Sequence, residues 1–463
     1  MAVIYKKIGI GIFSAFILSG CQISQKINEP NLKILDQYDE KHQESFYSFK
    51  WSDYINDPIL IDIVNLALEN NADLKIASLR ISEAQAAYGI QRSDLFPSIS
   101  GDAYYDRNRV PKDLSGVGTV VKSDQYFIGL GLNQWELDLW GRIRSLNEAA
   151  LESFFATQYN QLAVRNSIIQ QSVISYLTLC ELEKRIHFAN RSVENYEKSV
   201  RIFKRRYEVG AGSKVEYMQA QTLLSNAQAV VTQLQKSRDL TSNYLVQLIG
   251  VPVQIPKPEL DQVTFKNKAL RIGLPSDLLL NRPDIKSAEA SLKSKNANIY
   301  AARAAFFPRI ALTGSFGTSS SDLDGLFKSG SALWSFTPSI SIPIFTAGRL
   351  KNNVNLAEIR YEISIAEYEK SVQNAFREVA DALSEQRYLD EQLKVQFKGL
   401  DAFRETARLT QLQYDSGAIG YLDVLDAQRN LFSAEQQWIE TQSLLMQSYV
   451  NLYFALGGDT TWR

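Results

Sequence analysis

Two long stretches without helix-breaking residues constrain the fold of this chain more than any other feature. Residues 142–209 contain neither Gly nor Pro over 68 positions, and residues 349–416 contain only Gly399. Because an α-helix rises about 1.5 Å per residue, each stretch predicts a helix about 100 Å long. Such helices are stable only against other long helices, so we expect coiled-coil-like packing and no compact enzyme core. Glycines then end both helices, and return helices are expected over 214–249 and 422–456.

The same pattern of residues occurs twice along the chain. Phe96-Pro97 recurs 211 residues later as Phe307-Pro308, and Gly141-Arg142 recurs 207 residues later as Gly348-Arg349. The second copy is therefore four residues shorter than the first between these two motifs, where a loop can shorten at little cost. We therefore predict two structural copies, each with a helix, two strands, a very long helix and a return helix.

Alternating segments mark the expected strands. Residues 334–342 alternate large apolar side chains with Ser and Thr, and residues 127–134 alternate apolar side chains with Gly and Asn. Segments of about ten residues with one apolar and one small or polar face are typical of membrane β-barrels, although half-buried strands of soluble sheets alternate too. The expected strands are 99–106, 124–136, 310–318 and 333–344.

Four strands in one chain are too few for a barrel, because about eight are needed even for a filled one. An open sheet edge in lipid would leave unpaired backbone groups, each costing several kcal/mol. If these strands span a membrane, several chains must share one barrel. Three chains supply twelve strands with an aqueous interior, and they assemble the long helices into a hollow cylinder. The fold class predicted is thus a mixed α and β membrane protein, a homotrimer with a β-barrel and an α-barrel tunnel.

The residues from Met1 to Cys21 have the pattern of a processing signal. Lys6 and Lys7 precede an apolar run over 8–18 that is too short for a membrane helix. Cys21 after Leu-Ser-Gly resembles the lipobox of bacterial lipoproteins, in which the thiol is acylated, and Gln22 favours the outer membrane. An ordinary signal peptide with an incidental cysteine is the alternative.

Composition argues against several other functions. The chain has 50 basic and 51 acidic residues, so nucleic acid is not an expected partner. Two histidines and two cysteines cannot build a Cys/His zinc site, and no Ser/His/Asp or Cys/His arrangement is present. We expect no enzyme activity, no cofactor and no metal, although a carboxylate-only metal site is not excluded. Cys180 lies in an apolar helical context and is expected to pack.

Four motifs are typical of one known family: WELDLWGR at 135–142, LPSDLLLNRPDI at 274–285, LDVLDAQ at 422–428 and NLYFALGG at 451–458. The chain resembles the TolC family of outer-membrane efflux factors, in the OprM-like lipoprotein subgroup. The resemblance implies a trimer in the outer membrane of a Gram-negative bacterium, with its tunnel in the periplasm. It also implies an exit duct for an inner-membrane transporter, joined through a periplasmic adaptor (membrane fusion) protein.

A duct needs a gate, and the turns after the two long helices are the expected place for it. Asp423 and Asp426 are three residues apart, hence on one helical face, and a trimer would place six carboxylates around the axis. Such rings favour cations, and the pair aligns with the aspartates of the TolC constriction. The alternative is simple stabilisation of the first helical turn by acidic residues. Glu216 occupies the equivalent place in the first copy.

The resemblance also implies a latch between neighbouring helices. Tyr414 and its twin Tyr207 match family positions that hold helices closed by hydrogen bonds. Ile419 stands where the best-known member carries a latch arginine. An apolar seal by Ile419 is the alternative to a polar latch.

The chain is expected to have five parts. The expected cargo is drugs or other small compounds. A type I secretion or metal-export duct, or a periplasmic coiled-coil adaptor, is the alternative. The parts are a lipoprotein signal peptide (1–20), a lipidated segment (21–57), a first repeat (58–250), a linker (251–283) and a second repeat (284–457).

Overall fold

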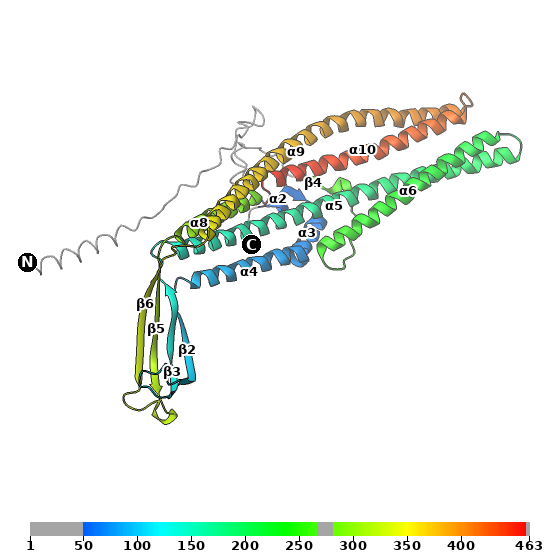
Figure 1. The fold of residues 1–463 in the computed structure, drawn as a ribbon. Coiled ribbons are helices and arrows are strands. Elements are labelled where there is room, and N and C mark those ends of the chain that lie inside the picture. Colours follow the sequence, from blue (N-terminus) through cyan, green and yellow to red (C-terminus); the bar gives the residue numbers. More distant parts are fainter. Residues whose placement is uncertain (1–49, 257, 266–280, 460–463) are drawn as a thin grey trace, which may run out of the picture. The chain divides into compact units, whose positions relative to one another are not determined.

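The computed structural model describes residues 50–256, 258–265 and 281–459 (Figure 1). The expected signal peptide, Cys21 and residues 274–280 of the linker motif lie outside the described residues. The chain forms two compact units. Among the described residues, the first unit comprises Ile81–Thr157 and Ala288–Glu369, and the second comprises the remainder.

The first unit contains a four-stranded antiparallel sheet in the order β2-β3-β5-β6. Its strands are β2 (Ser98–Val110), β3 (Val121–Glu136), β5 (Arg309–Ser320) and β6 (Ala332–Ser341). Strand β6 ends three residues before the predicted end at 344, where Pro343 has no N–H for the ladder. The other three strands run two to four residues further into their loops than the predicted ranges, because the ladder partners continue there.

Both halves of the chain have one helix directly before their strand pair and two long helices after it. Helices α4 (Ala72–Ser93) and α8 (Pro283–Ala304) precede the strand pairs. Helices α5 (Arg142–Glu208) and α9 (Arg349–Asp415) each contain 67 residues without a break. They begin after Gly141 and Gly348, which have φ values of 79° and 82°. The return helices are α6 (Lys214–Ile249) and α10 (Tyr421–Ala455), so both halves have the same element order.

The second unit contains the main hydrophobic core, where α3, α5, α6 and α10 meet. Its largest fully buried side chains include Tyr54, Tyr176 and Tyr453. The shorter elements of this unit are α2 (Trp51–Tyr54), α3 (Pro58–Asn70) and η1 (Leu260–Gln262), with β1 (Ile55–Asn56) paired antiparallel to β4 (Thr264–Phe265). The loop between β5 and β6 holds the short helix η2 (Leu323–Gly325).

A buried carboxylate fixes the start of α3 in this core. Asp57 accepts hydrogen bonds from the N–H groups of Ile59 and Leu60, at 2.9 and 3.1 Å, and the Tyr176 hydroxyl donates to it at 3.1 Å. Pro58 occupies the first helical turn, where its missing N–H costs nothing.

Cys180 is fully buried beside this group, and burial raises the pKa of its thiol far above the ordinary value. The neutral thiol is a poor nucleophile. In a Cys21→Ser variant, where Cys180 is the remaining cysteine, we expect almost no modification by a maleimide in the native protein. Full modification in denaturant is the matched control. Rapid labelling of the folded protein would contradict the buried packing of Cys180.

Candidate functional site

The two turns that connect the long helices have the same backbone geometry. Gly210 and Gly417 have φ values of 73° and 76°, in the left-handed region that favours glycine. The N–H groups of Ala211 and Ala418 each donate to the carbonyl five residues earlier, both at 2.8 Å. This bond closes a Schellman-type helix end. The glycine spacing in the sequence therefore corresponds to two equivalent helix stops.

Among the described residues, one of the two aspartates predicted at the gate forms an ion pair. The Asp426 carboxylate lies 2.8 Å from the Arg429 guanidinium, and both side chains are more than half exposed. Asp423 is exposed at the third position of α10. Residues 421–429 at the start of α10 therefore carry two carboxylates and one guanidinium.

Glu216 closes a capping box at the start of α6. Its carboxylate accepts from the Ser213 N–H at 2.9 Å, and the Ser213 hydroxyl accepts from the Glu216 N–H at 3.1 Å. This reciprocal pair satisfies two N–H groups that the helix leaves free. The first turn therefore uses its acidic residue as a cap, whereas Gly420 starts α10 without a side-chain cap.

Tyr414 lies in a cluster that joins α5, α9 and α10. Arg206 donates to the Tyr414 hydroxyl at 3.0 Å, and the Tyr414 ring meets the Tyr421 ring edge-on at 4.8 Å. Tyr421 in turn packs on Phe203, with ring centroids 4.4 Å apart, and shares a hydrogen bond with the Ser199 hydroxyl. Burial raises the pKa of Tyr421, which keeps its hydroxyl neutral.

The other two predicted latch residues do not join this cluster. Tyr207 is 43 % exposed, and its ring is parallel to that of Tyr217 on α6 at 6.3 Å. Ile419 is half-buried in the turn before α10. The prediction from sequence missed Phe203, Tyr421, Arg206 and Ser199. Their only local signal was the spacing of Ser199 and Phe203, four residues apart on one helical face.

The Ser199–Tyr421 contact gives a test of how firmly α5 holds α10. We expect Tyr421→Phe to cost about 1 kcal/mol of unfolding free energy through the lost hydrogen bond, and Tyr421→Ala about 3–5 kcal/mol through the cavity. Ser199→Ala should add little to Tyr421→Phe in a double-mutant cycle. Thermal unfolding of the four variants measures the coupling, and strictly additive losses would contradict it.

The sheet of the first unit has one apolar and one polar face. Side chains of the apolar face are strongly exposed, and the opposite face carries Ser, Thr, Gly, Asn and Asp. In the described chain, each outer strand, β2 or β6, pairs on one side only. Strongly exposed members of the apolar face include Ile99, Phe316, Trp334, Phe336 and Ile340.

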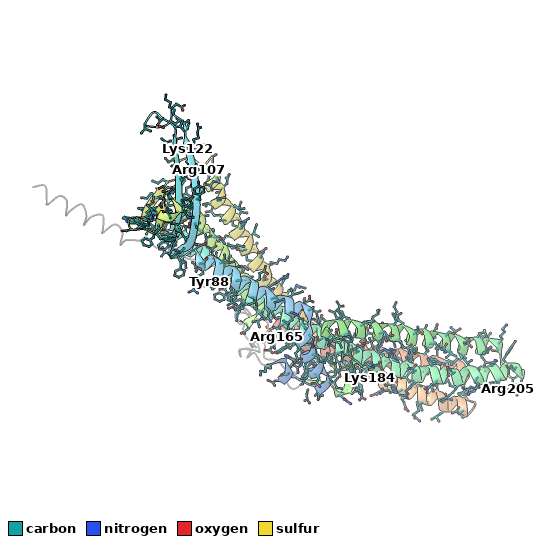
Figure 2. All side chains as sticks on the ribbon, turned by 90° about the horizontal axis from the view of Figure 1, so that it is seen from below. Tyr88, Arg107, Lys122, Arg165, Lys184 and Arg205 are labelled. Carbon is teal, nitrogen blue, oxygen red and sulfur yellow. The ribbon has the colours of Figure 1, made fainter. Side chains whose placement is uncertain are left out.

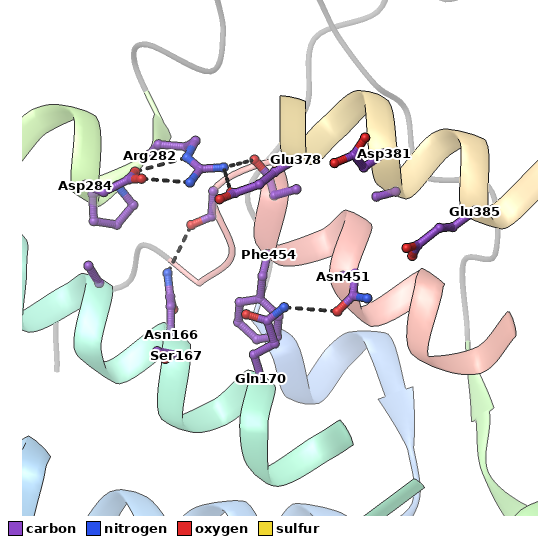
Figure 3. A pocket seen from close by; sticks show the side chains of 15 residues that line it. Asn166, Ser167, Gln170, Arg282, Asp284, Glu378, Asp381, Glu385, Asn451 and Phe454 are labelled. Atoms are coloured by element: carbon purple, nitrogen blue, oxygen red, sulfur yellow. Dashed lines mark hydrogen bonds and ion pairs between the residues drawn. The ribbon is translucent and has the colours of Figure 1, made fainter. Parts of the chain in front are cut away.

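A polar cavity of about 420 Å³ lies in the second unit beside the motif residue Arg282 (Figure 3). Arg282 is 9 % exposed and pairs with Asp284 and Glu378, each at 2.7 Å, while it donates to the Ala455 carbonyl at 3.0 Å. Asn166 donates to the Gly457 carbonyl at 3.1 Å in the same wall. These contacts connect the start of α8 with α9 and with the end of α10. The Asn-Arg-Pro-Asp segment therefore has a structural role, which is to hold these three helices together.

Among the described residues, no helix combines the length and the apolar character needed to cross a membrane.

These features, two long helical hairpins and a four-stranded sheet with an exposed apolar face, agree with the family that the sequence matches. The model of the outer membrane efflux protein family matches residues 63–251 and again 274–458. The chain belongs to this family.

Curated relatives match along almost the whole chain. The solvent efflux pump outer membrane protein SrpC of Pseudomonas putida is 40% identical over 458 residues, covering 96% of this chain and 97% of the relative. The outer membrane protein OprJ of Pseudomonas aeruginosa is 35% identical over 458 residues, covering 96% and 94%. The structure is similar to the open state of the Neisseria gonorrhoeae MtrE outer membrane channel, with a TM-score of 0.84 and 37% identity, over 95% of this chain and 98% of that one.

Proposed function

We propose that three copies of this chain form a channel in the outer membrane of a Gram-negative bacterium, continued by a helical tunnel in the periplasm. The observation that carries the proposal is the sheet of β2, β3, β5 and β6. It exposes an apolar face, and both of its edges are unpaired in the described part of the chain. Such a sheet is stable in lipid only when its edges pair with further strands. Four strands are too few to close on themselves, and three chains give twelve.

The helices fit the same arrangement. The two halves, 58–250 and 284–457, act as two repeats joined by the linker 251–283, and each supplies one helical hairpin to the tunnel wall. The shared element order and the equivalent turns support this division. The expected signal peptide (1–20) and lipidated segment (21–57) would attach the chain to the outer-membrane lipid through Cys21.

The channel would serve as the exit duct of an efflux pump, connected by a periplasmic adaptor to an inner-membrane transporter. Relatives are named for solvent and antibiotic efflux, which favours small organic compounds as cargo. The gate would lie at the turns, with Asp423 and Asp426 facing the axis, Tyr414 and Tyr207 in the latch, and Ile419 and Glu216 beside them. A type I secretion or metal-export duct is the second candidate. No catalytic step is part of the proposal.

Reconstitution tests the channel directly. The detergent-extracted protein should migrate as a trimer and conduct ions in a planar lipid bilayer. A stable monomer without conductance would contradict the channel, and a water-soluble monomer without detergent would favour a periplasmic adaptor.

The cargo needs a second measurement. A strain that lacks the gene should become sensitive to organic solvents and antibiotics, and the intact gene should restore growth. Sensitivity to metal salts alone, or loss of a secreted protein, would favour the second candidate.

A further inference from the structure

The apolar face of the β2–β3 hairpin ends in a ladder of charged pairs toward the loop. Side chains of directly opposed residues lie on the same face of a sheet, and every second pair shares that face. Moving along this face from the helix end to the loop end, the chemistry changes from apolar to aromatic to charged. The pairs are Ile99–Leu132, Gly101–Leu130, Ala103–Ile128, Tyr105–Tyr126, Arg107–Asp124 and Arg109–Lys122.

The aromatic and the first charged pair form one connected group. The rings of Tyr105 and Tyr126 are 4.6 Å apart and inclined by 28°. The Tyr105 hydroxyl donates to Asp124 at 2.6 Å, and the Arg107 guanidinium lies 3.3 Å from the same carboxylate. Asp124 is therefore matched by Arg107. Tyrosines at this place are typical of the boundary between the hydrocarbon and the headgroups.

The last pair is unbalanced. Arg109 and Lys122 are directly opposed and both exposed, and within the described residues neither forms an ion pair with a carboxylate. Like charges in this position destabilise a sheet unless an anion lies between them. With Arg107 and Asp124 included, the two charged pairs at the loop end of this face comprise three cations and one carboxylate.

At the opposite end of the same sheet, the cations contact a carboxylate. Arg142 and Arg309 share the carboxylate of Glu136, at 2.8 and 2.7 Å, and that carboxylate is 10 % exposed. Within the described residues of the sheet, exposed cations that form no ion pair with a carboxylate thus lie at the loop end, next to the aromatic pair.

We propose that Arg109 and Lys122, with Arg107 beside them, bind the phosphate group of a membrane lipid headgroup. Figure 2 labels Arg107 and Lys122 on the two neighbouring strands. A lipid whose chains cover the apolar pairs would place its headgroup next to the tyrosines, where a phosphate can accept hydrogen bonds from both cations. The inference rests on the proposed membrane position of the sheet.

Native mass spectrometry of the detergent-extracted trimer tests the site, with phosphatidic acid and phosphatidylcholine as probes. The first exposes a phosphate monoester, and in the second choline covers the phosphate. We expect the wild type to prefer phosphatidic acid and the double variant Arg109→Gln/Lys122→Gln to lose this preference, with about a fivefold loss per removed charge. Lys75→Gln/Arg80→Gln on α4, which removes two exposed charges elsewhere, is the matched control.

Three outcomes would overturn the proposal. They are a wild type without preference, a double variant that retains it, and an equal competition by inorganic phosphate at the same concentration, which would indicate a site for free anions. If the double variant loses its trimer, the charge-conserving Arg109→Lys and Lys122→Arg variants replace it. They must retain the preference that the single variants Arg109→Gln and Lys122→Gln reduce.

Conductance in a planar bilayer, measured on the same preparations, separates this inference from the proposed function. A conducting trimer without lipid preference contradicts the lipid site alone. A wild type that does not conduct contradicts the channel.

Discussion

Asp423→Asn is expected to remove most of the block that we expect divalent cations to impose on the channel. Asp423 is exposed at the start of α10, and its neighbour Asp426 already has the Arg429 guanidinium at 2.8 Å. Three copies of Asp423 would therefore contribute most of the uncompensated negative charge at the axis. We expect the blocking concentration to rise about tenfold or more, because one unit charge at about 4 Å contributes about 1 kcal/mol even in bulk water.

The pairing of Asp426 makes this prediction specific. Asp426→Asn should weaken the block less than Asp423→Asn, whereas Arg429→Gln should strengthen it by freeing the second carboxylate. Asp401→Asn, an exposed change on α9, is the control and should leave the block unchanged. Single-channel recordings with added Mg²⁺ measure all four variants. An unchanged block in Asp423→Asn would remove this residue from the gate.

The sequence predicts the helices well because their boundaries depend on local chemistry. Gly210 and Gly417 supply the left-handed residues that end α5 and α9. The 67 residues of each helix contain no Pro, and Gly399 in α9 is their only Gly. The capping box of Ser213 and Glu216 was also readable from their spacing, although the prediction assigned Glu216 to the gate alone.

The sequence did not predict the contacts between residues that are distant in the chain. Ser199 and Tyr421 are 222 residues apart, and Arg206 and Tyr414 are 208 apart. Helical periodicity shows which face is apolar, but the partner of that face depends on how the helices pack. The opposition of Arg109 and Lys122 likewise follows from strand register, which the alternating pattern does not specify by itself.

We expect the largest structural effect from a substitution in a glycine pair at the centre of the sheet. Gly129 and Gly317 are directly opposed on β3 and β5, and the Phe127 ring is buried beside them at 6 % exposure. A Cβ on Gly317 would lie 2.6 Å from the Gly129 Cα and still closer to the Ile128 carbonyl oxygen. Both obstacles are backbone atoms, so no side chain can move aside.

Gly317→Ala is therefore expected to force β3 and β5 apart. Overpacking costs about 1–3 kcal/mol where side chains can adjust, so a clash with backbone should lie at or above the upper end. β3 and β5 connect the strand pairs of the two halves, and the shared barrel would contain this fault three times. We expect most of the detergent-resistant trimer and its conductance to be lost.

Gly101→Ala is the matched control for this change. Gly101 lies on β2 of the same sheet, and an added Cβ would meet no atom within 4 Å. The same substitution there should leave the trimer and the conductance as in the wild type. Equal losses in both variants would mean that the sheet tolerates no alanine for a reason other than the β3–β5 approach. A wild-type trimer in Gly317→Ala would show that β3 and β5 can separate without opening the barrel, and the close approach of the two glycines would then have no role in closing it.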